Sequence, residues 1–351
     1  MSQAVGADGG GAAARPVRVG LVGYGFAGRD IHAPLLEQAG LDVTRVVTSD
    51  AGRREQVAHD LPDARYVSSL EALLLESGEV DVVVLASPTA LHAEQAVACL
   101  DAGLPLVVDK PIGTTAAQAN WVVEHARKVG VRLTVFQNRR WDAEQLTLQR
   151  LLAEGRLGRV FRFERRWERW RPQPKDRWRE RNLPADGGGL LLDLHSHLVD
   201  SAVQLFGPVR EVYAELAAHT TVAEDDAFLA LGHESGVRSH LGALSLAGAP
   251  GPRTRVLGES GSYVVTTFEQ EPTPFGDLAD PDDDHCGWLV AGESREAVFR
   301  APGEAADFYR AVAAAVTEGA AMPVDPRDSV HVMAVIDAAR DSAAERRVVS
   351  L

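Results

Sequence analysis

The chain has 351 residues, of which 45% are hydrophobic and 25% charged, a globular composition long enough for two domains. Its formal net charge of −14 argues against nucleic acid as a partner. The sequence shows neither a membrane-spanning apolar run nor a signal peptide, and its two cysteines are too few for a disulfide framework or a thiolate metal site. We therefore expect a soluble, cytoplasmic enzyme or sensor with no membrane partner.

The first half of the chain alternates between β-type and helical segments. A Gly/Ala-rich tail at 1–15, which we expect to be disordered, precedes a strand, a glycine-rich turn and a helix that reaches about Gln38. We place the strands at 17–22, 43–48, 80–85, 106–109 and 131–136, and the later helices at 52–59, 68–76, 90–102 and 115–129. Apolar strands alternating with amphipathic helices predict a Rossmann domain at 16–137, with a doubly wound parallel sheet covered on both faces.

The second half, 138–351, has a different pattern. Residues 160–170 alternate, with Phe161, Phe163, Arg165 and Trp167 on one face. Similar alternation predicts strands at 209–218, 226–232, 236–246, 253–257 and 262–269. We expect helices after the glycine run 187–189 and at 304–317 and 326–345, and an exposed acidic loop at 270–286. The predicted class is therefore α/β, in which the Rossmann domain precedes an α+β substrate-binding and oligomerisation domain with a large, mainly antiparallel, open-faced sheet.

The turn Gly23-Tyr24-Gly25-Phe26-Ala27-Gly28 follows the first strand and opens a helix, the context in which a GxGxxG motif binds a dinucleotide. Gly23 permits the tight turn, Gly25 lets the pyrophosphate approach the backbone, and Gly28 lets helix and strand pack closely. The N-terminus of the helix then favours the anion. We expect a nicotinamide cofactor at this turn.

The residues after the second strand select between NAD and NADP. An acidic side chain about 20 residues after the glycine turn usually holds the ribose hydroxyls of NAD. Ser49 at this position leaves room for a 2′-phosphate, which Arg53 or Arg54 would bind. If the register shifts by one residue, Asp50 takes the position and NAD is favoured. We predict NADP(H) over NAD(H).

Two further features indicate catalytic groups. Lys110, in Asp109-Lys110-Pro111, lies at the carboxyl end of a predicted parallel strand, where it can exchange a proton with a reacting oxygen. Asp193 and His197 are four residues apart on the polar stripe of a predicted helix, so the carboxylate can orient the imidazole. His195 points elsewhere on a helix, which opposes an Asp-x-His-x-His metal site, and we predict no metal.

Together with the run Ser87-Pro88 and His92, these motifs resemble the Gfo/Idh/MocA family, which comprises glucose–fructose oxidoreductase, inositol dehydrogenases and related NAD(P)-dependent sugar and polyol oxidoreductases. The resemblance begins at about residue 16 and covers nearly all of the remaining chain. The family's Glu-Lys-Pro is Asp-Lys-Pro here, which keeps the charge. Residues 137–142 and 169–180 are similar to the subgroup of scyllo-inositol dehydrogenases that use NADP. The resemblance also implies a homodimer or homotetramer that assembles through the C-terminal sheet.

The resemblance implies roles for particular side chains. Lys110 is the general acid/base, and Asp193 and His197 complete the catalytic set. The implied cofactor-binding residues are Gly23, Tyr24, Gly25, Phe26, Ala27, Gly28, Ser49, Arg53, Arg54, Ser87, Pro88, His92, Asp109, Lys110 and Asn138. The implied substrate-binding residues are Lys110, Arg140, Trp141, Arg165, Trp167, Asp193 and His197.

The Arg/Trp-rich segment 159–181 has two main interpretations, a strand and loop over the active site or an oligomer interface. For the whole chain we predict an oxidoreductase that interconverts a secondary alcohol and a ketone on a sugar or an inositol-like cyclic polyol by hydride transfer. The alternative is a non-catalytic NAD(P)-binding sensor or regulatory protein on the same fold.

Overall fold

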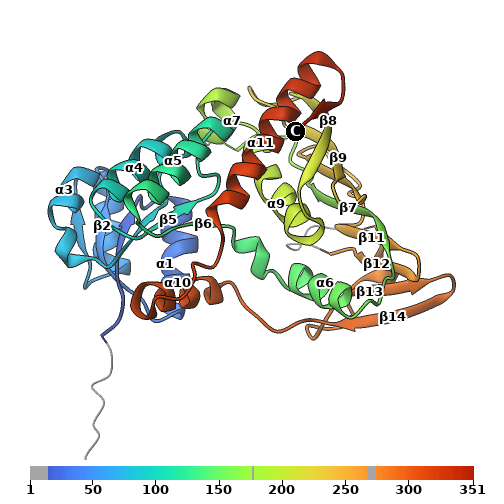
Figure 1. Cartoon of the computed structure of the whole chain (residues 1–351), viewed down its shortest axis with the longest axis horizontal. Helices are drawn as coiled ribbons and strands as arrows, with labels where there is room; N and C mark the ends of the chain where they lie inside the picture. The colour runs from blue at the N-terminus through green and yellow to red at the C-terminus, as the bar shows by residue number, and fades with distance from the viewer. Residues whose placement is uncertain (1–14, 176–177, 268–273) are drawn as a thin grey trace, which may run out of the picture.

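The structure, a computed structural model, describes residues 15–175, 178–267 and 274–351. Two sheets form the molecule, and the long helix α11 (Pro326–Glu345) runs between them (Figure 1). The predicted tail at 1–15 lies outside the described residues except for Arg15, whose guanidinium pairs with Asp81 at 2.7 Å. None of the helices described has the length and apolarity needed to cross a membrane.

The first sheet has six parallel strands in the order β3-β2-β1-β4-β5-β6. Its strands are β1 (Arg18–Val22), β2 (Asp42–Val47), β3 (Arg65–Val67), β4 (Val82–Leu85), β5 (Leu106–Asp109) and β6 (Leu133–Phe136). The π-helical segment η1 (Ala27–His32) continues into α1 (Ala33–Gln38), and the remaining helices are α2 (Ala51–Asp60), α3 (Leu70–Leu75), α4 (His92–Asp101) and α5 (Ala116–Val129). The predicted doubly wound domain is thereby confirmed. We had not anticipated β3, whose three residues are too few to show a period.

Alternate strand residues bury against opposite layers of helices. Val19 and Leu21 of β1 share a core with α1 and α2, whereas Val22 shares a core with α3, α4 and α5. The first of these cores also contains Phe308 and Tyr309 of α10 (Ala306–Glu318), so a helix late in the sequence returns to cover the Rossmann sheet (Figure 1). The second core continues through α11 into the other sheet.

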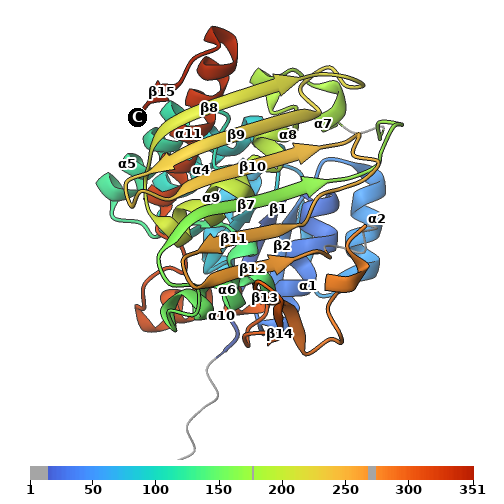
Figure 2. The same ribbon diagram turned by 90° about the vertical axis from the view of Figure 1, so that its right-hand side faces the viewer.

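Within the described residues, the second sheet has nine strands in the order β14-β13-β12-β11-β7-β10-β9-β8-β15, and of these only β7 and β10 pair in parallel. Its strands are β7 (Val160–Glu168), β8 (Val209–Ala217), β9 (Asp226–His233), β10 (Arg238–Leu244), β11 (Thr254–Gly258), β12 (Gly261–Val265), β13 (His285–Ala291), β14 (Ser294–Phe299) and β15 (Val349–Ser350). Helices α6 (Ala143–Ala153), α9 (His195–Phe206) and α11 lie against one face, and the described helices leave the other face open (Figure 2). This arrangement confirms the predicted large, mainly antiparallel, open-faced sheet.

Several local predictions differ from the structure. Helix α6 and strands β13 and β14 were not predicted, and β13 begins inside the expected acidic loop at 270–286. Residues 270–273 of that loop, and the end of the strand predicted at 262–269, lie outside the described residues. The predicted helix after 187–189 is broken at Leu194 into α8 (Leu190–Asp193) and α9. Phe161 is exposed although it shares the expected face of Phe163, because it lies at the start of β7, near the sheet's end.

Candidate active site

A cavity of about 540 Å³ lies between the glycine turn, the ends of β5 and β6, and the α8–α9 junction. The residues that line it are Phe26, Ala27, Ile31, Asp109, Lys110, Phe136, Asn138, Arg139, Trp167, Arg169, Arg171, Lys175, Asp193, Leu194 and His197. The structure therefore brings the three predicted catalytic residues, Lys110, Asp193 and His197, to one site. They come from both parts of the chain, so neither part forms the cavity alone.

Lys110 follows the last residue of β5, and its side chain is only 10% exposed. The Lys110 Nζ donates hydrogen bonds to the backbone oxygen of Asp193 at 2.6 Å and to Asp193 Oδ1 at 3.1 Å. Asp109 Oδ1 accepts the backbone N–H of Lys110 at 2.8 Å. Burial opposes the charge on Asp109, but His32 and Lys110 lower the pKa of its carboxyl below the ordinary value. At the end of this parallel strand, the Asp109 carboxylate thus binds the backbone N–H of Lys110, and the Asp193 carboxylate binds its Nζ.

His197 lies on α9, one turn beyond the break at Leu194. Its imidazole stacks on the Trp167 indole with ring centroids 5.7 Å apart and an interplanar angle of 29°, and both rings are buried. We expect Asp193 to orient His197, and the structure adds a second partner for this residue, the Lys110 Nζ. Sequence analysis missed the contact with Lys110 because the two residues are 83 positions apart, one after β5 and the other at the end of α8.

His195 is fully buried on the opposite side of α9 from the cavity lining. Its Nε2 lies 3.1 Å from the backbone oxygen of Ala227 in β9. Burial lowers the pKa of His195 to about 4, so the ring is neutral near pH 7. Among the described residues, no three His, Cys, Asp or Glu side chains are grouped so that they could hold a metal ion.

The glycine turn has the shape that a pyrophosphate requires. Gly23 has a φ of +96°, and a Cβ there would lie 2.7 Å from the Ala86 oxygen. A Cβ on Gly28 would lie 2.1 Å from the Gly23 oxygen, so only glycine lets η1 start this close to β1. A Cβ on Gly25 would meet nothing nearer than the Arg53 guanidinium at 3.8 Å, which leaves open space above the turn. No described side chain caps the first turn of η1, so its backbone donors fit a bound anion.

The two candidate arginines for a 2′-phosphate differ in their surroundings. Asp50, the alternative NAD-selecting residue, caps α2 by accepting the Arg53 N–H at 2.8 Å. The Arg53 side chain extends from this first turn of α2 to the glycine turn. Arg54 instead donates to the backbone oxygen of Ser49 at 3.1 Å, and its guanidinium lies 5.4 Å from the centre of the Tyr66 ring. Arg53 is therefore the arginine closer to the expected cofactor.

His92 and Ser87 support the loops beside the cavity. The ring nitrogens of His92 lie 2.8 Å from the backbone oxygens of Pro111 and Ser87, so this buried histidine ties together the turns that follow β4 and β5. Ser87 Oγ donates to Gln95 Oε1 at 2.6 Å. Burial lowers the pKa of His92.

Three residues expected to bind substrate are placed elsewhere. Arg140 is buried and pairs with Asp200 in α9, which corrects the expectation that its guanidinium reaches the cavity. Arg165 belongs to β7 of the second sheet, and its buried side chain donates to Thr254 Oγ1 in the neighbouring strand β11 at 2.9 Å. Trp141 packs edge-on against Phe308 of α10. The sequence could not reveal the positions of the two arginines, because the carboxylate and hydroxyl groups that bind their guanidinium groups are distant along the chain.

The Arg/Trp-rich segment contributes to the cavity wall. Trp167, Arg169 and Arg171 line it, in agreement with the first of the two interpretations of 159–181. The guanidinium carbons of Arg139 and Arg169 lie 4.9 and 5.1 Å from the Trp167 ring centre. Residues 176–177 lie outside the described residues, and Trp178 begins the short helix α7 (Trp178–Arg181). Arg139, Arg169 and Arg171 are site residues that the sequence analysis did not single out individually.

Comparison with known proteins covers both parts of the chain. The pattern of an oxidoreductase family with an NAD-binding Rossmann fold matches residues 17–137, and that of the GFO/IDH/MocA C-terminal domain matches residues 145–264. The chain is 31% identical to scyllo-inositol 2-dehydrogenase (NADP(+)) IolW of Bacillus subtilis (strain 168), over 95% of this chain and 96% of that protein. It is 35% identical to the uncharacterized oxidoreductase YdgJ of Escherichia coli (strain K12), over 95% and 99%. The solved structure of the oxidoreductase yvaA from Bacillus subtilis is 30% identical, with a TM-score of 0.84 over 97% of this chain and 100% of that one.

Proposed function

Because the chain belongs to the Gfo/Idh/MocA family of NAD(P)-dependent oxidoreductases, which act on CH–OH groups, we propose that it interconverts a secondary alcohol and a ketone on an inositol-like cyclic polyol. The observation that carries this proposal is the position of Lys110, whose Nζ lies in the cavity beside Asp193 and in the same wall as His197. The name of IolW, an NADP-dependent scyllo-inositol dehydrogenase, supports the substrate class.

The chain's own residues would handle the proton. When bound, the nicotinamide supplies or accepts the hydride at the reacting carbon. In oxidation, the hydroxyl proton passes to the Lys110 Nζ, and in reduction the Lys110 ammonium returns it to the oxygen. Asp193 holds the Nζ in place, and His197 donates or accepts a hydrogen bond at the same oxygen. The Trp167 indole, stacked on the His197 imidazole, would hold that ring in the cavity wall.

The preferred cofactor in this proposal is NADP(H). The turn at Gly23–Gly28 would accommodate the pyrophosphate, and the proximity of the Arg53 guanidinium to this turn supports Arg53 as the cation for a 2′-phosphate. Asp50 is engaged as the cap of α2, which argues against the NAD-type arrangement in which it binds the ribose hydroxyls.

A substrate panel tests the proposal. Purified protein is incubated with NADP⁺ or NADPH and with inositols, inososes and sugars, and the absorbance of the reduced nicotinamide is followed. We expect turnover on an inositol-type substrate and a decrease in kcat of about 10²–10⁴ for Lys110→Ala, the range for a lost general acid/base. The control Lys128→Ala, on the exposed face of α5, should retain wild-type turnover. Cofactor binding without turnover on any member of the panel, or a Lys110→Ala enzyme within a few-fold of wild type, would contradict the proposal.

We also propose a homodimer or homotetramer that assembles through the uncovered face of the nine-stranded sheet (Figure 2). Tyr213, Phe228 and His240 on β8, β9 and β10 are each half-buried and belong to the alternating positions that do not face the helices. Light scattering in solution gives the mass, and a monomer would contradict this part of the proposal.

A further inference from the structure

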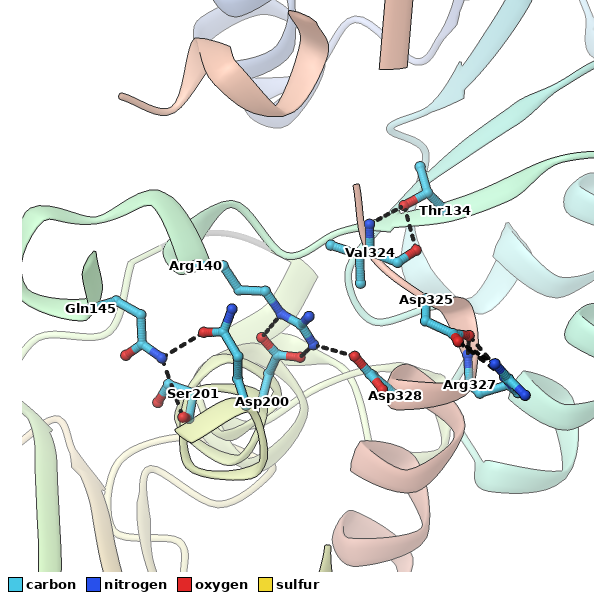
Figure 3. Close-up of polar contacts among 10 residues, drawn as sticks. Thr134, Arg140, Gln145, Asp200, Ser201, Val324, Asp325, Arg327 and Asp328 are labelled. Atoms are coloured by element: carbon cyan, nitrogen blue, oxygen red, sulfur yellow. Dashed lines mark hydrogen bonds and ion pairs between the residues drawn. The ribbon is translucent and has the colours of Figure 1, made fainter. Parts of the chain in front are cut away.

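A polar cluster, buried except at Asp328, joins three distant parts of the chain where the two sheets meet. Arg140 belongs to the 3₁₀ turn η4 (Asn138–Trp141) that follows β6, Asp200 to α9 and Asp328 to the first turn of α11. Arg140 Nε donates to Asp200 Oδ2 at 2.9 Å, while its Nη2 donates to Asp200 Oδ1 at 2.7 Å and to Asp328 Oδ2 at 2.9 Å (Figure 3).

The ion pair between Arg140 and Asp200 is shielded from water and has a well-defined geometry. The side chains of Arg140 and Asp200 are 9% and 3% exposed, so the ion pair is largely shielded from water. Two parallel bonds between a guanidinium and a carboxylate fix both distance and direction, which a lysine cannot do. Nearby hydrogen bonds reinforce the joint: Gln145 Nε2 donates to the Ser201 oxygen in α9, and Thr134 Oγ1 in β6 donates to the Val324 oxygen before α11 (Figure 3).

The cluster is related to the catalytic groups through two neighbouring strands. Lys110 follows β5 and Arg140 follows β6, and these strands pair in parallel. Lys110 binds Asp193 at the end of α8, whereas Arg140 binds Asp200 in α9. His197 lies between Asp193 and Asp200 in the sequence, so the segment that carries it is fastened at both ends to adjacent strand ends of the Rossmann sheet.

We propose that Arg140 is a positioning residue for the reaction, which fixes α9 so that Asp193 and His197 meet Lys110 in the cavity. The proposal rests on the catalytic roles assigned above, but its central claim concerns the contact between Lys110 and Asp193, which can be measured without a substrate. If Arg140 releases Asp200, α9 and the α8–α9 junction gain freedom, and the Lys110 amine becomes more accessible.

Arg140→Gln combined with Asp200→Asn tests this claim, because the double substitution removes the ion pair without leaving an unpaired buried charge. The matched control is Arg45→Gln with Glu76→Gln, which removes a partly buried ion pair at 2.8 Å within the Rossmann domain, far in sequence from α9. Thermal denaturation of both double variants shows how far each is destabilised.

The chain has only three lysines, Lys110, Lys128 and Lys175, which makes amine labelling a specific measurement. Brief acetylation with acetic anhydride well below the melting temperature, followed by peptide mass spectrometry, gives the labelling of Lys110 relative to the exposed Lys128. We expect this ratio to rise about fivefold or more in the Arg140/Asp200 variant, as for a locally opened site. With a substrate from the panel, kcat should fall about 10–100-fold, while the Kd for NADPH stays within a few-fold.

A purely structural role for Arg140 would lower the melting temperature and leave the labelling ratio at the wild-type value, and that result would overturn the proposal. A rise of equal size in the Arg45/Glu76 control would also overturn it. If the double variant does not fold, Arg140→Lys decides the matter, because it keeps the buried charge but has a single nitrogen that cannot form the two parallel bonds to Asp200. An unchanged ratio in this variant rejects the proposal. Absence of turnover on the panel would reject the proposed function. The labelling of Lys110 needs no substrate, so its result tests the role of Arg140 independently of the proposed function.

Discussion

At the scale of single residues, we expect the choice between NADP and NAD to depend on which side chains after β2 already have a hydrogen-bond partner within the protein. Asp50 accepts the Arg53 N–H as the cap of α2, while Arg54 bonds to the backbone of Ser49 and lies near Tyr66. The Arg53 guanidinium instead reaches the glycine turn, 3.8 Å from where a Gly25 Cβ would be. Of the two arginines in α2, Arg53 is therefore the one that we expect to contact a 2′-phosphate.

Arg53→Ala should weaken the binding of NADPH by about 1–3 kcal/mol, the usual value for a lost hydrogen bond to a charged group. The affinity for NADH, which has no 2′-phosphate, should change much less. Isothermal titration calorimetry with both cofactors measures the difference, and Arg54→Ala is the matched control, with a smaller effect expected. An equal loss for NADPH and NADH would show that Arg53 does not select the phosphate.

At the scale of elements, two glycines of the turn are needed for different reasons, one for the fold and the other for the cofactor. Gly28 is required by the fold, since its Cβ would overlap the Gly23 oxygen. Gly25 is not required by packing, because a Cβ there has an ordinary contact at 3.8 Å. We therefore expect Gly25 to be needed for the approach of the cofactor to the turn, and not for packing within the protein.

Gly25→Ala and Gly28→Ala separate these two reasons. Gly25→Ala should change the free energy of unfolding by no more than about 1 kcal/mol but lower NADPH affinity by about tenfold or more, because the methyl group occupies the place of the pyrophosphate. Gly28→Ala should lower the melting temperature, because η1 must move away from β1. Thermal denaturation with and without NADPH checks both, and wild-type NADPH affinity in Gly25→Ala would place the pyrophosphate elsewhere.

At the scale of the whole molecule, buried histidines couple stability to pH. His195 is held between α9 and β9, and burial lowers its pKa from 6.5 to about 4. Between these two values the unfolded chain binds a proton that the folded chain does not, so stability is complete above about pH 6.5 and falls as the pH decreases towards 4. His92, His233 and His331, whose pKa values burial also lowers, contribute in the same direction.

His195→Gln should reduce this loss of stability, since a glutamine amide can still donate to the Ala227 oxygen but takes up no proton. The share of the wild-type loss between about pH 7 and pH 5 that is due to His195 is about 2 kcal/mol. Urea denaturation at both pH values measures it, with His59→Gln, at an exposed position in α2, as the control. An unchanged pH dependence in His195→Gln would contradict the assignment.

The secondary structure of the Rossmann domain could be predicted because each element carries its own pattern. Strands such as β4 and β5 are buried on both faces and are therefore apolar, except for Asp109 at the end of β5, and the helices between them are amphipathic. In the second sheet, β9 and β10 alternate residue by residue, as predicted. Short or edge elements such as β3 and β14 were missed, because pairing with a neighbouring strand, rather than a period of their own, stabilises them.

For the site, the sequence by itself determined the positions that follow from a local pattern: the glycine turn after β1, Lys110 at the end of β5, and His197 on its helix. Only the tertiary structure decided which partner each charged group has. Asp193 binds Lys110, Asp50 caps α2, and Arg140 is buried against Asp200. The physical reason is that an ion pair or hydrogen bond depends on the distance between atoms in space. Residues 60 or 83 positions apart in the sequence are brought within that distance only by the tertiary packing of the chain.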